Sequence, residues 1–333
     1  MQKILPLLIV ALLASFVSCR NESNSPAPVE SGIDYAKVII PETNADSAFA
    51  FVKAQTDLGF RHPGCAAHEL CAKYLATTMA RWCDTVIVQD FGATLWNGSQ
   101  VRGKNIIASL NPENETRILL AAHWDSRLWA DHDPNKDNVK KPIMGANDGA
   151  SGVGALMEMA RVMSAMPPSV GIDFIFFDLE DQGLPDWADT YEDNTWCKGS
   201  QYWAKVPHRP FYQAEYGILF DMVGSAQPRF TKEEISRHYA PGLTNKIWQS
   251  ATALGFGDVF QDKKTDAILD DHMYVNQIAG IPTADIVQNS PDCSFVSYWH
   301  TLGDDIDKIE PKTLKMVADV TLATIYGDHP AKP

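Results

Sequence analysis

The hydrophobic positions of the chain follow two spacings that alternate along most of its length. Apolar residues spaced three and four apart predict helices, and short apolar runs bounded by turn residues predict strands. The predicted helices are 47–58, 66–82, 153–163, 243–254 and 314–325. The predicted strands are 85–91, 105–110, 117–122, 170–177, 216–220 and 281–287. Such an alternation is typical of an α/β protein.

Two of the predicted strands indicate how the sheet is built. Segments 170–177 and 216–220 are apolar almost without interruption, as expected of central strands that are buried on both faces. The sequence contains no internal repeat and no obvious interdomain linker. It therefore predicts a single α/β domain with a central mixed, mostly parallel twisted β-sheet that is flanked by helices.

The first residues follow a different pattern. Lys3 precedes an apolar run, 4–17, which is too short and too abruptly ended to span a membrane stably and is typical of a secretory signal. Segment 16–19 resembles a bacterial lipobox, which implies a lipid on Cys19; ordinary cleavage nearby is the alternative. We therefore expect an exported protein, periplasmic or lipid-anchored to the bacterial envelope. Its predicted parts are a signal peptide with a lipobox, 1–19, a polar tether, 20–34, and a globular domain, 35–330.

Composition and charge narrow the choice of partners. With 333 residues, of which 45% are hydrophobic, the chain is long enough to bury a substantial core. Its net charge of -14 argues against nucleic acid or an anionic membrane as a partner, because both require a clustered basic surface. Membrane contact is then expected only through a lipid on Cys19. An acidic cleft favours a cationic ligand instead, such as a peptide α-ammonium group.

The cysteines exclude two kinds of site. Of the six cysteines, five remain if Cys19 carries the lipid, and an odd number leaves at least one thiol free. No two are spaced as Cys-x-x-Cys, which argues against a cysteine zinc site and against a thioredoxin-like redox pair.

Carboxylates and imidazoles follow the predicted strands at the points where the strands end. They are His123 and Asp125 after 117–122, Glu180 and Asp181 after 170–177, Asp221 after 216–220 and His300 after 281–287, with Asp148 at a helix start. Taken singly, Asp148 can be a helix cap, Asp221 a loop acid and His300 a core histidine. Ligands of open α/β sheets, however, bind at the carboxyl ends of the strands. The pattern therefore predicts a zinc site with oxygen and nitrogen ligands.

The order of these motifs resembles the zinc aminopeptidase clan of co-catalytic exopeptidases. The motifs are a His-x-Asp, an Asn-Asp-Gly turn, an adjacent acid pair, an Asp after a strand and a distal His, spread over 105–326. The resemblance implies a metal held by Asp148, Asp181 and His300. It also implies that Glu180 is the general base, and that His123 and Asp221 complete a second metal site in the two-metal aminopeptidases.

A narrower set of features resembles the glutaminyl cyclases, which share this fold and bind a single zinc. One feature is the acid doublet Asp270-Asp271 before a histidine, where plain aminopeptidases usually have one acid. A solvated loop is the alternative explanation of the doublet. The likeness implies a pocket walled by Trp187, Ile268, Phe295 and Trp299. It also implies that Asp221 and Asp270 hydrogen-bond near Glu180 and take part in catalysis.

Two positions depart from the animal cyclases. Asp181 stands where they carry Glu, and Asp285 replaces one of their histidines. Both departures favour a bacterial branch of the animal-like cyclases. A third acid, Asp178, is expected to lie on the opposite side of the backbone with a structural role and no catalytic one.

These resemblances lead to one expected function and two alternatives. The expected function is that of a glutaminyl-peptide cyclotransferase with one zinc per chain, which converts the N-terminal Gln of peptides or proteins to pyroglutamate and releases ammonia. The alternatives are a two-zinc aminopeptidase and a non-catalytic lipoprotein that binds peptide or metal. The sequence lacks the motifs of serine hydrolases, of zincins and of nucleotide-binding enzymes.

Overall fold

The computed structural model describes residues 32–190 and 192–331. The predicted signal peptide, 1–19, and residues 20–31 of the predicted tether lie outside the described residues. The ordered elements begin with a short 3-10 helix, η1 (Tyr35–Lys37). Within the described ranges, no helix has the length and the apolar content needed to cross a membrane.

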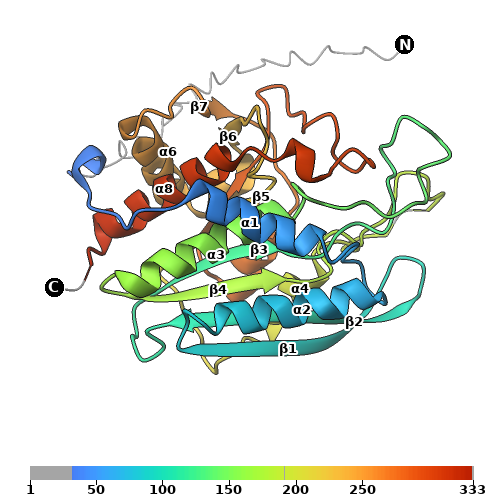
Figure 1. Cartoon of the computed structure of the whole chain (residues 1–333), viewed down its shortest axis with the longest axis horizontal. Coiled ribbons are helices and arrows are strands. Elements are labelled where there is room, and N and C mark those ends of the chain that lie inside the picture. Colours follow the sequence, from blue (N-terminus) through green and yellow to red (C-terminus); the bar gives the residue numbers. More distant parts are fainter. Residues whose placement is uncertain (1–31, 191, 332–333) are drawn as a thin grey trace, which may run out of the picture. The chain divides into compact units, whose positions relative to one another are not determined.

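Six strands form one mixed sheet at the centre of the domain (Figure 1). They are β1 (Thr85–Thr94), β2 (Gln100–Leu110), β3 (Arg117–His123), β4 (Gly171–Phe177), β5 (Tyr216–Asp221) and β8 (Thr283–Val287), in the order β1-β2-β4-β3-β5-β8. The pairs β4/β3, β3/β5 and β5/β8 are parallel, whereas β1/β2 and β2/β4 are antiparallel. The predicted mixed, mostly parallel sheet is therefore confirmed.

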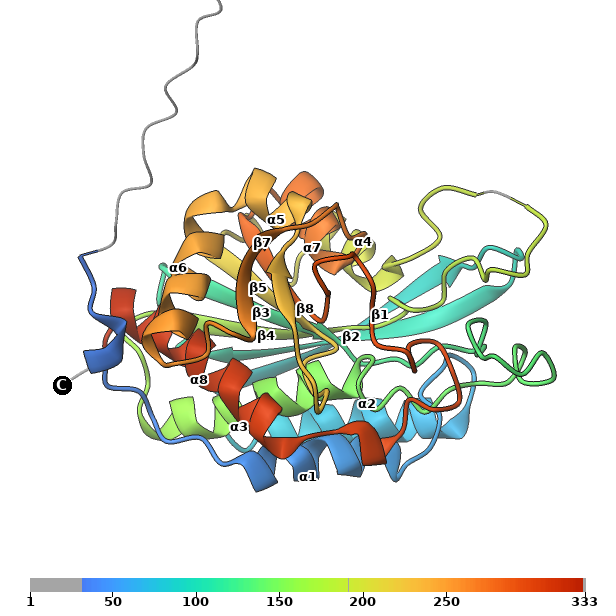
Figure 2. The same ribbon diagram turned by 90° about the horizontal axis from the view of Figure 1, so that it is seen from above.

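Helices cover both faces of this sheet (Figure 2). One face carries α1 (Ala45–Thr56), α2 (Ala66–Met79), α3 (Ala150–Ala165) and α8 (Pro311–Asp328). The other face carries α4 (Lys198–Lys205) and α7 (Asp271–Tyr274). The π-helical turn η2 (Val275–Ala279) packs against both of these helices. The two remaining α-helices, α5 (Glu234–Tyr239) and α6 (Pro241–Ala253), pack beside β8. A 3-10 helix, η3 (Ile306–Lys308), precedes α8. The single-domain α/β architecture expected from the sequence is thus present.

The alternation of side chains along the strands explains why two cores form. In β3, Ile118 and Leu120 point into the larger core, which α1, α3 and α8 cover. Their neighbours Leu119 and Ala121 point to the opposite face, where they pack with Trp203 of α4. Because side chains alternate between the two faces of a strand, an uninterrupted apolar run serves both cores at once. Every residue of β3 and β4 is buried.

The predicted segments correspond to observed elements, with small shifts at their ends. The helix predicted at 47–58 begins at Ala45, because the Asn44 side chain caps it by accepting a hydrogen bond of 2.9 Å from the Ser47 backbone N–H. The pattern did not predict α4, α5, α7 or the two-stranded sheet of β6 (Phe230–Lys232) and β7 (Phe260–Lys264). These elements are short, so they contain too few residues to establish a period.

The described cysteines are not paired. Cys65, Cys71, Cys83, Cys197 and Cys293 all carry free thiols, which agrees with the expectation of at least one. Cys19, the predicted lipid site, lies outside the described residues.

Candidate active site and metal centre

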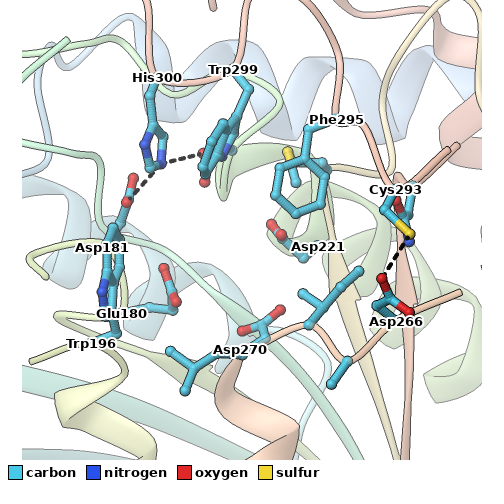
Figure 3. A pocket seen from close by; sticks show the side chains of 16 residues that line it. Glu180, Asp181, Trp196, Asp221, Asp266, Asp270, Cys293, Phe295, Trp299 and His300 are labelled. Carbon is cyan, nitrogen blue, oxygen red and sulfur yellow. Dashed lines mark hydrogen bonds and ion pairs between the residues drawn. The ribbon is translucent and has the colours of Figure 1, made fainter. Parts of the chain in front are cut away.

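The carboxyl ends of the parallel strands meet at one edge of the sheet, and the functional side chains predicted there lie together. They are His123 at the end of β3, Glu180 and Asp181 after β4, Asp221 at the end of β5, Asp148 before α3 and His300 after β8. Figure 3 shows four of them, Glu180, Asp181, Asp221 and His300. All six side chains are buried or nearly so. A site assembled from five separate segments thus forms where the topology predicts it.

A tight turn after β4 directs the acid pair into this site. Asp178 points away from the site, where its carboxylate pairs with His68 Nε2 at 2.9 Å and accepts a hydrogen bond of 2.6 Å from the Lys104 backbone N–H. Leu179 then adopts a left-handed conformation with φ 57°, which is uncommon for residues other than glycine. The structural role expected of Asp178 agrees with these contacts, because they anchor the turn that carries Glu180 and Asp181.

Three of the side chains, Asp148, Asp181 and His300, form a group that we call the metal trio. His300 Nε2 lies 3.1 Å from Asp181 Oδ1 and 3.5 Å from Asp148 Oδ2. One ligand atom from each residue lies within 4.8 Å of the others. Asp181 Oδ2 is buried and has no hydrogen-bond partner among the described residues. Two carboxylates and one imidazole fit zinc, and three protein ligands leave a position open for substrate, as in catalytic zinc sites.

A carboxylate, that of Asp131, faces the second ring nitrogen of His300, Nδ1. Asp131 Oδ1 lies 3.5 Å from His300 Nδ1, and Asp131 itself is held by Arg127 in a two-point ion pair with distances of 2.7 and 2.6 Å. A carboxylate on the far nitrogen of a metal-binding imidazole fixes its orientation and makes it a stronger ligand. Asp131 and Arg127 were not predicted from the sequence, because they lie in an irregular segment after β3 that has no hydrophobic period.

The residues expected to form a second metal site in an aminopeptidase also lie together. His123 Nε2 is 3.0 Å from Asp148 Oδ1 and 3.3 Å from Asp221 Oδ1, so that Asp148 belongs to both groups. The geometry by itself therefore accommodates one metal or two.

The expected general base, Glu180, lies in a strongly acidic environment. Burial raises the pKa of Glu180 well above its usual value, and the charges of Asp270 and Asp181 add to the rise. Burial and the charges of Asp270 and Asp148 raise the pKa of Asp221 to about 7, although a hydrogen bond with His123 opposes the rise. Burial also raises the pKa of Asp270. With a pKa of about 7, Asp221 is able to hold and release a proton near neutral pH.

These side chains line a pocket with a volume of about 350 Å³. Of the predicted wall residues, Ile268, Phe295 and Trp299 line it, and the rings of Phe295 and Trp299 meet edge to face at 4.7 Å. The full lining is Asp148, Glu180, Asp181, Trp196, Asp221, Met222, Asp266, Ala267, Ile268, Leu269, Asp270, Asn289, Cys293, Phe295, Trp299 and His300. No lysine or arginine is among these lining residues, which suits a cationic group on the ligand.

The expectation for Trp187 requires a correction. Trp187 is not among the residues that line this pocket; it is 40% exposed and packs against Trp96 and Trp129 outside it. Trp196 lines the pocket instead, and its ring lies parallel to that of His300 at 6.0 Å. Both tryptophans belong to the long irregular segment between β4 and α4. Spacing along such a segment does not determine which ring folds back over the site.

The acid doublet is buried and is not a solvated loop. Asp270 caps α7, accepts a hydrogen bond of 2.5 Å from the Asp271 backbone N–H and lines the pocket. Asp271 is fully buried behind it. The side chain of Asp285 lies nearby, with Oδ2 3.7 Å from His272 Nδ1. Asp285, which replaces a histidine of the animal cyclases, therefore lies behind the pocket and is not among the residues that line it.

Comparison with known proteins places this geometry in a family. Two solved structures cover 86% of this chain and 99% of their own: a Zn-dependent exopeptidase from Parabacteroides distasonis, 44% identical with a TM-score of 0.85, and the glutaminyl cyclase of Tannerella forsythia, 47% identical with a TM-score of 0.84. Aminopeptidase YwaD of Bacillus subtilis is 27% identical over 67% of this chain. The chain spans only 44% of the length of that aminopeptidase.

A family model covers the catalytic part of the fold. The model of Peptidase family M28 matches residues 105–325, from β2 to α8, and so includes every residue of the metal trio together with Glu180. The chain therefore belongs to peptidase family M28.

Proposed function

We propose that the protein is a zinc-dependent glutaminyl-peptide cyclotransferase of the bacterial type, which converts the N-terminal Gln of peptides or proteins to pyroglutamate with release of ammonia. The observation that carries the proposal is the pocket, in which Glu180 and the metal trio lie beside Asp270 under a wall of Trp196, Phe295 and Trp299. The 47% identity with the Tannerella forsythia glutaminyl cyclase over nearly all of that chain supports it.

The metal trio would hold one catalytic zinc. When bound, zinc acts as a Lewis acid on the side-chain carbonyl of the substrate Gln. The reaction joins the α-amino nitrogen of the substrate to its own side-chain carbonyl carbon and breaks the bond from that carbon to the amide nitrogen, which leaves as ammonia. It is intramolecular, so it requires no second metal to activate a water.

Glu180 moves the proton in this reaction. A terminal amine has a pKa of roughly 7.7–8.0, so part of it is already neutral near pH 7. Glu180 takes the proton that the amine loses on attack and returns it to the leaving nitrogen. The charge of Asp270 helps to raise the pKa of Glu180, and Asp221, whose own pKa is raised to about 7, would share the proton in this pH range.

The aromatic wall orders the substrate. The rings of Trp196, Phe295 and Trp299 restrict the short Gln side chain to conformers in which the amine faces the carbonyl carbon. Fixing such a conformer before reaction removes an entropic part of the barrier.

A two-zinc aminopeptidase is the second candidate. The specific observation in its favour is the close approach of His123, Asp148 and Asp221, which supply a second set of ligands. In that reaction a metal-activated water, and not the substrate's own amine, is the nucleophile.

Mass spectrometry of peptide products separates these candidates. We expect a peptide with N-terminal Gln to lose one ammonia and to remain otherwise intact, and a zinc chelator to prevent the loss. The matched control is the same peptide with N-terminal Asn, whose side chain is one methylene too short to close a five-membered ring. Release of the free N-terminal residue would establish the aminopeptidase. An unchanged Gln peptide would leave only a non-catalytic binding protein.

The metal content provides an independent comparison. For the cyclase we expect His123→Ala to leave the content of tightly bound zinc unchanged at one per chain, because His123 is not in the metal trio. For the aminopeptidase the wild type would hold two zinc ions, and the same variant would lose one.

The two tryptophans after β4 provide a test of the pocket. We expect Trp196→Ala to lower kcat/KM for a Gln peptide by about tenfold, because the ring that restricts the substrate and covers His300 is removed. Trp187→Ala, which truncates the same residue type outside the pocket, should change kcat/KM by less than about twofold. Equal effects of the two substitutions would contradict this assignment of the wall.

Export is proposed on the sequence of residues 1–19, which lie outside the described residues. The protein would be periplasmic or anchored to the envelope by a lipid on Cys19. Mass spectrometry of the mature protein tests this: an acylated N-terminus at Cys19 would support the anchor, and an unmodified N-terminus elsewhere would contradict it.

A further inference from the structure

A buried thiol contacts the general base. Cys197 Sγ lies 3.2 Å from Glu180 Oε1, and both side chains are buried. In the described part of the chain, no other hydrogen bond to the Glu180 carboxylate is found. The thiol is the donor in this contact, and the carboxylate oxygen accepts. Burial and the nearby charge of Glu180 raise the pKa of the Cys197 thiol well above its usual value, so the sulfur stays protonated and able to donate.

The backbone holds the thiol in this place. The Cys197 N–H donates to the Glu180 carbonyl at 2.9 Å, and the Lys198 N–H donates to the Leu179 carbonyl at 3.0 Å. The start of α4 is therefore docked on the turn that carries the base. Gly199 permits this close approach, because a Cβ there would lie 2.3 Å from the Asp178 carbonyl oxygen.

The conformation of Cys197 itself is unusual. Its φ of 56° lies in the left-handed region, which residues other than glycine rarely adopt and which persists only where the surroundings impose it. Trp196, the preceding residue, covers His300 with its ring. One dipeptide thus contacts both a residue of the metal trio and the general base.

We propose that Cys197 is a positioning residue, whose thiol holds Oε1 of Glu180 so that the other carboxylate oxygen faces the substrate amine. The inference rests on the proposed cyclase function. Its physical basis is geometric: the Cys197 thiol lies 3.2 Å from Oε1 of Glu180, and an oxygen of Asp270 lies within 4.8 Å of both groups. Without this donor the Glu180 side chain is free to rotate away from its productive orientation. Small misplacements of a reacting group can reduce a rate by up to about a hundredfold.

Two substitutions at this position isolate the hydrogen bond. Because thiols are weak donors, we expect Cys197→Ala to lower kcat for a Gln peptide by about tenfold, with KM and zinc content nearly unchanged. Cys197→Ser supplies an O–H in place of the S–H and should restore kcat to within about threefold of wild type. Alanine and serine would both have to adopt the same left-handed conformation at position 197. The difference in kcat between the two variants therefore measures the effect of the hydrogen-bond donor alone.

A second buried thiol provides the matched control. Cys71 lies in the core on α2, away from the pocket. We expect Cys71→Ala to lower thermal stability without changing kcat. A wild-type kcat in Cys197→Ala, or an equal defect in Cys197→Ser and Cys197→Ala, would overturn the positioning role.

An infrared measurement keeps this inference separable from the proposed function. The S–H stretching band of Cys197 is identified by its loss in Cys197→Ser, and we expect Glu180→Gln to shift it to higher frequency, because a neutral amide is a weaker acceptor than a carboxylate. A wild-type protein without cyclase activity would overturn the proposed function. A band that does not respond to Glu180→Gln would overturn the contact itself.

Discussion

Replacement of Glu180 by Gln is expected to slow cyclisation of a Gln peptide by about a thousandfold while the zinc stays bound. The amide has nearly the same shape as the carboxylate but does not accept the proton of the attacking amine. The metal is retained because Glu180 is not one of the three ligands, which are Asp148, Asp181 and His300. The measurement combines the rate of ammonia release with the zinc content of the same sample.

The thermal midpoint of Glu180→Gln shows whether a loss of activity results from unfolding. Burial and neighbouring acids disfavour the charged form of Glu180, so a neutral amide should not lower the thermal midpoint. Asp186→Asn removes an acid from the loop that follows, where the side chain is 69% exposed, and should leave the rate unchanged. Full activity of Glu180→Gln would exclude Glu180 from proton transfer, and loss of zinc would make it a ligand.

Replacement of His300 by Ala is expected to remove the zinc itself. His300 supplies the only nitrogen of the metal trio, and its Nε2 lies within 3.5 Å of both carboxylates. Loss of a residue that merely supports a ligand already weakens metal binding by about 10–100-fold, so loss of the ligand should weaken it by more than about a hundredfold. Zinc content after dialysis, together with cyclase rate, measures the effect.

A neighbouring histidine serves as the control for this substitution. The ring of His132 lies 5.4 Å from that of His300, but its side chain is 34% exposed and pairs with Asp186. We expect His132→Ala to keep its zinc. A His300→Ala protein that still binds zinc tightly and turns over substrate would disprove the metal trio. Loss of zinc in both variants would indicate instead that the metal is bound by Asp131, His132 and His300.

The strand-exit residues show how much of the site the sequence predicts. His123, Glu180, Asp181 and Asp221 could be assigned because each follows a buried apolar run, and parallel strands bring their carboxyl ends to one edge. This inference needs only the period of the hydrophobic pattern and the direction of the strands. Asp148 and His300 belonged to the same predicted zinc site, but their assignment as ligands together with Asp181 came from the resemblance to a family.

The family resemblance also had a limit, and the tryptophans show where it lies. It implied an aromatic wall that includes Trp187, whereas the observed pocket is lined by Trp196, Phe295 and Trp299. Trp187 and Trp196 both lie on the irregular connection between β4 and α4. No period governs such a segment, and its course depends on contacts with distant parts of the chain, such as the approach of Arg127 to the Trp196 ring at 4.5 Å.

The sequence by itself determined the α/β class, the strands and long helices, and the residues at the strand exits. These features depend on local periodicity and on the rule that parallel strands end at one edge. Only the tertiary structure decided that Cys197 meets Glu180, that Asp131 supports His300, and that the acid doublet is buried. These features involve segments that are separate in the sequence. No local pattern of hydrophobic residues indicates that such segments meet, so only the packing of the whole domain brings them together.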